Sequence, residues 1–342
     1  MDYRLHQNPS VWGSLFESWA SLLPESILPL PFLHPSYQHT WWQSMGGGEW
    51  SAEESKLAII TAHQADRLIG IAPLFIGQKP GSEPALHLIG AVEVSDYLDF
   101  VVRKPDLEAF LGGLLIFIRS HPDLKELGLD LENLVDSSPS LSMLQDLAEA
   151  QSWSFSKEVL QPSPYISLPG NFETYLAGLD KKQRHEIRRK LRNASNGHEA
   201  AWYFVEDGSL LAEELRAFIG MMRNEDEKNS FLKPEMENFI HTVAHNIFDL
   251  GTLRLAFLTI DGEKAAAFLS FVCCDRLLVY NSSRADNWMQ LSPGWVLLAR
   301  QIEWAISAGL KEVDMMRGDE RYKYKFGGVD RFVWRALLSP QR

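Results

Sequence analysis

Residues 291–328 have the sequence LSPGWVLLARQIEWAISAGLKEVDMMRGDERYKYKFGG, and this stretch decides the fold. Its apolar periodicity predicts a helix over 293–307, which Gly309 ends, followed by a strand over 312–316. A short polar segment between glycines follows the strand. A helix that returns the chain to a new strand in this way indicates an α/β unit.

Further elements lie on both sides of this stretch. The second half of the chain is expected to contain helices over 210–222 and 234–250, strands over 253–260, 265–273 and 276–281, the helix and strand just described, and a terminal strand over 331–338. The turns between the three consecutive strands are Asp261-Gly262 and Cys274-Asp275. Turns this short predict an antiparallel meander.

The first half of the chain repeats this order. It is expected to contain helices over 11–23 and 36–45, strands over 56–62 and 68–76, a strand region within 86–89 and 97–102, a helix that Pro105 opens, a strand over 125–131, a helix over 141–151 and a strand over 153–160. We therefore predict an α/β fold with mixed (α+β) sheets, built as two tandem units over 1–165 and 166–342. Two unrelated α/β domains that share strand–turn–strand features are the alternative.

Composition limits the kinds of partner. The net charge of −12 over 342 residues argues against generic binding to DNA or to an anionic membrane, although it leaves room for a local basic site. No apolar stretch approaches the roughly 20 residues of a membrane span, and the first residues lack the pattern of a signal peptide. Cys273 and Cys274 are adjacent and poorly placed for a disulfide, which fits a cytoplasmic protein.

The polar segment after the strand over 312–316 gathers groups that suit proton transfer. It starts at the carboxyl end of a strand, where α/β folds commonly bind ligands. General acid–base catalysis needs one group that accepts a proton and another that donates one. Asp319 or Glu320 is the expected base, and Tyr322 is the expected acid.

Neighbouring residues of this segment are candidates for substrate binding. Arg317 and Lys323 suit an anionic substrate or a phosphate. Asp314 lies two residues before Met316 on the expected strand, and so shares its face. A solvated loop whose charges pair with one another is the alternative interpretation.

A basic stretch, KKQRHEIRRKLR, occupies 181–192. Asp180 with Gln183 resembles a capping box, so a helix is expected to begin here. Seven basic residues and one acidic residue give this stretch +6 in a chain of −12, which leaves −18 for the remainder. Arg184 and Arg188 lie one helical turn apart and are expected to hold a phosphate of an anionic partner. A solvated basic helix against the protein's own acidic surface is the alternative.

Two other features complete the list of candidates. Asp96, Tyr97 and Asp99 lie in VSDYLDFVV (94–102), where they either line a substrate cleft between the two halves or cap the strand and face solvent. The histidines include one pair four residues apart, His241 and His245, without the carboxylate that a metal site requires. We therefore expect no metal.

Three stretches together, 94–102, 181–192 and 291–328, resemble the BioF2-like acetyltransferase domain of the GNAT superfamily, a group that includes CelD-type proteins of polysaccharide loci. The order of helices and strands is also that of GNAT proteins, and the tandem layout is similar to that of Fem-type peptidyltransferases. The resemblance implies that acetyl-CoA, or another acyl-CoA, binds where the helix over 293–307 begins. A phosphate suits a helix N-terminus, and the residues implied as cofactor-binding are Gln290, Ser292, Gly294 and Trp295.

The resemblance therefore implies an N-acyltransferase that moves an acyl group from coenzyme A to a primary amine, and we expect no covalent intermediate. It also implies an acceptor that is a small molecule or glycan, such as an amino sugar or a polysaccharide or cell-envelope precursor. The first half lacks the Ser-Pro-Gly helix start and is expected to shape the acceptor cleft. The alternatives are a Fem-like peptidyltransferase that uses aminoacyl-tRNA, and a non-catalytic accessory protein of polysaccharide biosynthesis.

Overall fold

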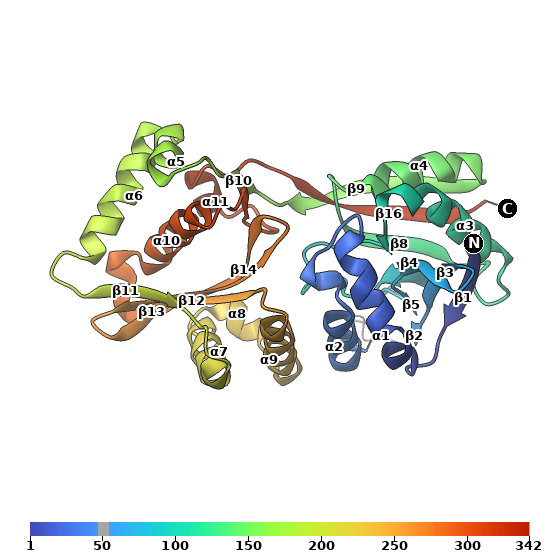
Figure 1. The fold of residues 1–342 in the computed structure, drawn as a ribbon, viewed down its shortest axis with the longest axis horizontal. Helices are drawn as coiled ribbons and strands as arrows, with labels where there is room; N and C mark the ends of the chain where they lie inside the picture. The colour runs from blue at the N-terminus through green and yellow to red at the C-terminus, as the bar shows by residue number, and fades with distance from the viewer. Residues whose placement is uncertain (47–54, 342) are drawn as a thin grey trace. The chain divides into compact units, whose positions relative to one another are not determined.

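The computed structural model describes residues 1–46 and 55–341 (Figure 1). The chain forms two compact units: an N-terminal unit of Met1–Pro162 with Arg331–Arg342, and a C-terminal unit of Ser163–Asp330. Helices pack on sheets, two of which contain both parallel and antiparallel strand pairs, so the expected α/β class with mixed sheets is confirmed.

The N-terminal unit contains two sheets, with strand orders β1-β3-β4-β7 and β2-β5-β6-β8-β16-β9. Its strands are β1 (Asp2–His6), β2 (Lys56–Leu57), β3 (Ile59–Gln64), β4 (Arg67–Ala72), β5 (Leu74–Gly77), β6 (Ala85–Leu88), β7 (Val101–Val102), β8 (Gly128–Val135), β9 (Trp153–Pro162) and β16 (Phe332–Pro340). Its α-helices are α1 (Val11–Leu22), α2 (Pro35–Met45), α3 (Leu107–Ser120) and α4 (Pro139–Ala150), with 3₁₀ turns η1 (Leu23–Glu25), η2 (Pro31–Leu33) and η3 (Lys104–Asp106).

Two strands expected in this unit are each divided between the two sheets. The stretch 56–62 forms β2 and β3, and the stretch 68–76 forms β4 and β5. Pro73 lies between β4 and β5, and it has no N–H to donate to a ladder. The expected strand over 97–102 is wrong for most of its length, because only β7 pairs there.

The terminal strand β16 was expected to complete the C-terminal unit, and this expectation is wrong. It lies between β8 and β9 of the N-terminal unit and is antiparallel to both. Val333, Ala336 and Leu338 are buried in that position. Alternation of apolar residues identifies a strand, but it does not identify the neighbours that accept its backbone hydrogen bonds.

The C-terminal unit contains one six-stranded sheet in the order β10-β15-β14-β13-β12-β11. Its strands are β10 (Tyr165–Ser167), β11 (Ala200–Phe204), β12 (Leu253–Ile260), β13 (Glu263–Cys273), β14 (Arg276–Arg284) and β15 (Glu312–Asp314). Its helices are α5 (Phe172–Gly178), α6 (Lys181–Ala194), α7 (Gly208–Met222), α8 (Asp226–Phe231), α9 (Pro234–Asp249), α10 (Pro293–Ser307) and α11 (Arg321–Lys325), with the 3₁₀ segment η4 (Asp286–Leu291) before α10.

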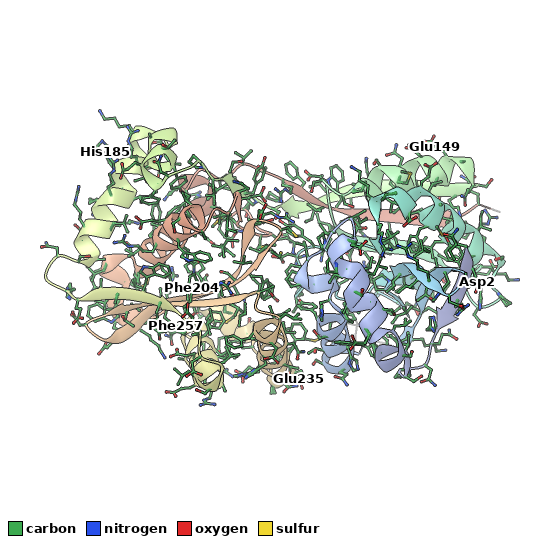
Figure 2. The ribbon with its side chains drawn as sticks, in the orientation of Figure 1. Asp2, Glu149, His185, Phe204, Glu235 and Phe257 are labelled. Atoms are coloured by element: carbon green, nitrogen blue, oxygen red, sulfur yellow. The ribbon has the colours of Figure 1, made fainter. Side chains whose placement is uncertain are left out.

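The meander expected in this unit is confirmed, since β12, β13 and β14 pair antiparallel in chain order. Helix α10 then connects β14 to the parallel strand β15. Helices α7 and α9 cover one face of the sheet, and α10 with α6 covers the other (Figure 1). Phe257 of β12 and Phe204 of β11 illustrate the aromatic side chains that this sheet carries (Figure 2).

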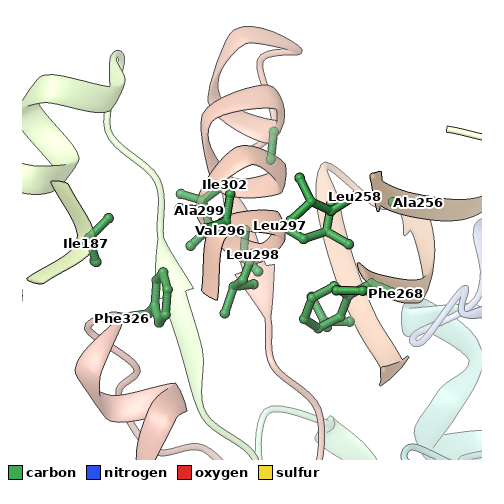
Figure 3. Packing of buried hydrophobic residues seen from close by; sticks show 14 of the residues in the cluster. Ile187, Ala256, Leu258, Phe268, Val296, Leu297, Leu298, Ala299, Ile302 and Phe326 are labelled. Atoms are coloured by element: carbon green, nitrogen blue, oxygen red, sulfur yellow. The ribbon is translucent and has the colours of Figure 1, made fainter. Parts of the chain in front are cut away.

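The core on the α10 face fixes the position of that helix. Val296, Leu297 and Ile302 of α10 are almost completely buried, and they lie between Leu258 of the sheet and Ile187 of α6 (Figure 3). Burying a side chain of this size contributes roughly 1.5–3 kcal/mol. The N-terminus of α10 is therefore held rigidly beside the sheet. In the part of the chain that the structure describes, no helix is long and apolar enough to cross a bilayer.

Candidate active site

The site begins where two parallel strands stop pairing. Strands β14 and β15 pair only over Arg276–Leu278 and Glu312–Asp314. Strand β14 continues to Arg284, whereas the chain after Asp314 turns away through Met316, whose φ is +60°. A cavity of about 410 Å³ lies beyond the last paired residues, lined by residues 279–284 of β14 and 315–317 after β15. Ligands commonly bind at such a position in α/β sheets.

A β-bulge shapes the β14 side of the cavity. Leu269 of β13 pairs with Asn281, but its neighbour Ser270 pairs with Val279, so Tyr280 is the additional residue. Bulges are frequent next to active sites because they redirect side chains. Val279 packs in the cluster around α10, and Ser282 accepts a hydrogen bond from Lys228 of α8. Strand β14 thus contacts both the α10 cluster and α8.

The N-terminus of α10 forms another wall of the cavity through Gly294, Trp295 and Leu298. A Cβ atom built at Gly294 would meet nothing within 4 Å, so this position leaves open space beside the helix. Ser292, although a serine just before a helix commonly caps it, has φ +55° and makes no side-chain capping hydrogen bond. The helix is also reached through η4 instead of directly from a strand, and Gln290 is exposed and outside the cavity lining.

Two lysines lie against Trp295. The Nζ atom of Lys190 is 3.5 Å from the centre of the Trp295 ring, and that of Lys325 is 5.5 Å away. Burial lowers the pKa of Lys190 despite the neighbouring Glu186. The basic helix α6 therefore places the ammonium group of Lys190 against Trp295, at the edge of the cavity.

Only two of the three residues expected to act as acid or base line the cavity. Glu320 and Tyr322 line the cavity, whereas Asp319 is exposed and outside its lining. Burial, with additional effects of the Glu320 and Glu225 carboxylates, raises the pKa of Tyr322 well above its usual value. Tyr322 is therefore protonated near neutral pH, which suits a proton donor.

Lys323 was expected to bind substrate, but its ammonium group is buried and binds the protein backbone. Its side chain lines the cavity but is only 2% exposed. The ammonium group donates to the carbonyl oxygens of Met316, Arg317 and Gly318, at 3.0, 2.6 and 3.2 Å. These bonds hold the loop between β15 and α11.

Asp314 also supports this loop. It is completely buried and accepts a hydrogen bond from the backbone N–H of Met316. Asp314 is not among the residues that line the cavity. The expected strand over 312–316 is two residues too long, because β15 ends at Asp314. Arg317, in contrast, lines the cavity as expected of a substrate ligand.

The basic helix α6 begins as expected, with the Asp180 side chain accepting from the N–H groups of Lys182 and Gln183. Arg184 and Arg188 point to separate partners: Arg188 pairs with Glu173 of α5, and Arg184 donates to the carbonyl of Ala177. Neither arginine lines the cavity. His185 of the same helix is exposed at the surface of the unit (Figure 2).

Asp96, Tyr97 and Asp99 belong to the interior of the N-terminal unit. Tyr97 and Asp99 have no exposed surface, and Asp96 is 8% exposed. The Asp99 carboxylate accepts hydrogen bonds from the hydroxyls of Ser138 and Ser140 where α4 begins. Burial raises the pKa of Asp99 to about 6. These contacts attach the irregular segment before β7 to α4.

Three charged residues that line the cavity, Glu225, Lys228 and Arg284, were not predicted from the sequence. Lys228 of α8 pairs with Glu225 at 2.9 Å, and Arg284 at the end of β14 lies 3.6 Å from the same carboxylate. Glu225 and Lys228 lie in a run of charged residues, 225–228, which is typical of a solvated loop. Only the fold shows that this run faces β14. Within residues 1–46 and 55–341, no cluster of three His, Cys, Asp or Glu residues is arranged to hold a metal ion.

Comparison with known proteins identifies the C-terminal unit. Residues 181–324 match the family model described as an acetyltransferase (GNAT) domain. No curated protein gives a significant match to the chain.

Solved structures show the same fold over the whole chain. FemX is similar with a TM-score of 0.65 at 11% identity, covering 100% of this chain and 96% of FemX. A conserved protein of unknown function from Bacteroides thetaiotaomicron has a TM-score of 0.57 at 12% identity, covering 99% of this chain and 100% of that protein. L-PGS from Bacillus licheniformis has a TM-score of 0.52 at 12% identity, covering 90% of this chain and 92% of that protein.

At these identities the structural neighbours establish the fold, and the family model establishes the type of domain. Both agree with the cavity, which opens where the parallel strands of the matched domain separate. As expected, residues 181–324 match an acetyltransferase (GNAT) domain, which supports an N-acyltransferase, and the whole chain has a fold similar to that of FemX.

Proposed function

We propose that the protein transfers an acyl group, such as acetyl, from coenzyme A to a primary amine in the cavity between β14 and the loop after β15. The observation that carries this proposal is the convergence of Glu320, Tyr322 and the N-terminus of α10 on that one cavity. A volume of about 410 Å³ falls in the usual range for small-molecule sites.

Glu320 and Tyr322 are proposed to move the protons. The amine nitrogen attacks the thioester carbonyl, so that a C–N bond forms and the C–S bond breaks. The Glu320 carboxylate takes the proton that the amine loses, and the Tyr322 hydroxyl gives its proton to the leaving sulfur. The proton on Glu320 then returns to Tyr322, which restores both groups. Asp319 is the less favoured base, because it lies outside the cavity lining.

The walls of the cavity fit a coenzyme A thioester. The space beside Gly294 admits the pantetheine arm along the start of α10. Lys190 and Lys325, whose ammonium groups lie 3.5 and 5.5 Å from the centre of the Trp295 ring, suit the phosphates. Gln290 and Ser292 lie just before α10 and remain part of this proposed phosphate site.

The acceptor follows from the resemblance to the BioF2-like and CelD-type proteins. On that basis we propose an amino group of an amino sugar, or of a precursor of a polysaccharide or of the cell envelope, in the cytoplasm. Asp96, Tyr97 and Asp99 are buried in the N-terminal unit, so their proposed part in acceptor binding is indirect, through the shape of that unit.

A Fem-like transfer from aminoacyl-tRNA is the second candidate. The structural similarity to FemX over the whole chain and the basic helix α6 favour it. Lys181, Lys182 and Arg192 are exposed on α6 and suit a phosphate backbone. The donor would then carry its anionic part on α6, while its acyl end enters the same cavity.

A thiol-release assay and a tRNA-binding assay separate the two candidates. Free thiol is measured with acetyl-CoA and a panel of primary amines, and tRNA binding is measured at 50 and 200 mM salt. The coenzyme A proposal expects amine-dependent thiol release. Thiol release that is absent, together with salt-sensitive tRNA binding that Arg188→Gln and Arg189→Gln weaken, would establish the second candidate instead.

A further inference from the structure

The side chains that line the cavity have a net positive charge, whereas the chain as a whole is negative. Four basic side chains, Lys228, Arg284, Arg317 and Lys323, line it together with two acidic ones, Glu225 and Glu320. The chain as a whole carries −12. A positive cavity in an acidic protein attracts and orients an anionic ligand.

The contacts of Lys323 and Lys228 show that these two side chains bind the protein itself. Lys323 donates to three backbone carbonyls and lies 2.9 Å from Glu320. Lys228 lies 2.9 Å from Glu225 and donates to the carbonyl of Ser282 at 2.5 Å. Both ammonium groups therefore serve to hold the walls of the cavity.

Arg284 has a looser attachment. Its guanidinium lies 3.6 Å from Glu225, a carboxylate that Lys228 already contacts more closely, and 49% of its side chain is exposed. A guanidinium has five N–H donors, so one long ion pair leaves it capacity to bind a carboxylate or phosphate in two places. Arg317 lines the same cavity from the loop after β15.

The position of Arg284 indicates which substrate it serves. Ser282 and Arg284 share one face of β14, and their side chains contact Lys228 and Glu225 at the start of α8. Because of the bulge at Tyr280, Val279 lies on this same face, where it packs in the cluster around α10. Arg284 contacts Glu225 at the start of α8, whereas Lys190 and Lys325 of the proposed coenzyme site contact Trp295 of α10, so the two groups of basic residues have different partners.

We propose that the acceptor is an anionic amine, in which a carboxylate or phosphate accompanies the primary amino group. Arg284 and Arg317 bind the anionic group, and this places the amine toward Glu320 and Tyr322. The inference rests on the proposed acyl transfer for the role of the amine, whereas the anion site itself rests only on the cavity.

Matched pairs of amines test this inference by calorimetry on the full chain. The pairs are O-phosphoethanolamine with ethanolamine, glucosamine 6-phosphate with glucosamine, and alanine with alaninamide. The first two pairs report on a phosphate and the third on a carboxylate. We expect at least one anionic member to bind about 10-fold or more tightly than its neutral partner, which corresponds to about 1.4 kcal/mol.

Variants locate the binding. Arg284→Gln and Arg317→Gln should each weaken the anionic member about 10-fold or more, whereas Arg216→Gln, a matched loss of charge on the exposed side of α7, should not. Equal affinities within every pair would overturn the inference, as would equal effects of the three variants. It is also overturned if Arg284→Gln raises the KM for acetyl-CoA and leaves the acceptor unaffected.

The same experiment distinguishes failure of the acyl-transfer proposal. If an anionic amine binds and the two arginine variants weaken it, but no thiol is released from acetyl-CoA, then the anion site stands and coenzyme-dependent transfer is wrong. If thiol is released equally with neutral and anionic partners, then transfer stands and the anionic acceptor is wrong.

Discussion

The carboxylate of Glu320 lies 2.9 Å from the ammonium of Lys323, and that ammonium also binds three consecutive carbonyls of the loop after β15. One buried lysine thus connects the loop to the proposed base. In Lys323→Met, the carbonyls lose their donor while the side chain keeps its approximate volume. We expect a loss of about 2–4 kcal/mol in the free energy of unfolding, measured by denaturant titration. Lys311→Met, on an exposed lysine of the same unit, should change it by less than about 0.5 kcal/mol.

Two glycines at the cavity provide a matched pair for the backbone. Gly318 has φ +110°, and a Cβ there would lie 2.5 Å from the Glu320 carboxylate; Gly294 has open space around it. Gly318→Ala should cost about 1–3 kcal/mol of stability and should displace Glu320, so that kcat falls as well. Gly294→Ala should leave the unfolding free energy within about 1 kcal/mol of the wild-type value. Similar losses in both variants would contradict the strained geometry of Gly318.

Tyr322 and Tyr324 form a second matched pair. Tyr322 lines the cavity, whereas Tyr324 is exposed and donates to Asp330 at 2.8 Å. Tyr322→Phe removes the proposed proton donor, so kcat for acyl transfer should fall about 100-fold. Tyr324→Phe should retain activity within a few-fold. If the activity of Tyr322→Phe equals that of Tyr324→Phe, the hydroxyl of Tyr322 does not act as the acid.

The buried carboxyl of Asp99 should make the free energy of unfolding depend on pH. Burial raises the pKa of Asp99 to about 6 in the folded state, above its usual value of 3.8. The folded state therefore binds the proton more tightly between these two values, so this carboxyl destabilises the fold progressively as pH rises from about 4 to about 6. Over this range the contribution of Asp99 to the free energy of unfolding falls by about 3 kcal/mol.

The Asp99→Asn variant isolates this contribution. Denaturant midpoints measured between pH 4 and 7 should show that the wild type loses stability relative to Asp99→Asn as pH rises. Parallel pH profiles for the two proteins would show that Asp99 titrates as in the unfolded chain.

Local patterns predicted the C-terminal unit well. The strand over 253–260 and the helix over 293–307 agree with β12 and α10 at both ends. Clear turns and a proline at the first helical position mark these boundaries, and both signals are local. The cap of α6 at Asp180 is a local signal of the same kind.

Features that depend on distant partners were not predictable in this way. The place of β16 depends on which sheet has a gap for it, and Glu225 acquires its role only because α8 packs near β14. Lys323 was expected to bind substrate, because the residues around a lysine do not show whether its side chain is exposed or buried. Its role as a donor to the loop carbonyls requires the fold.

Titration of acetyl-CoA into the wild type and into Gly294→Trp, followed by calorimetry, tests the central claim most directly. The indole in the variant should fill the open space beside α10 without disturbing the core, because a Cβ at this position meets no atom within 4 Å. We predict saturable binding to the wild type with a Kd below about 1 mM, and binding at least about 10-fold weaker to the variant. No binding to the wild type, or equal binding to both proteins, would contradict acyl-coenzyme A use at this cavity.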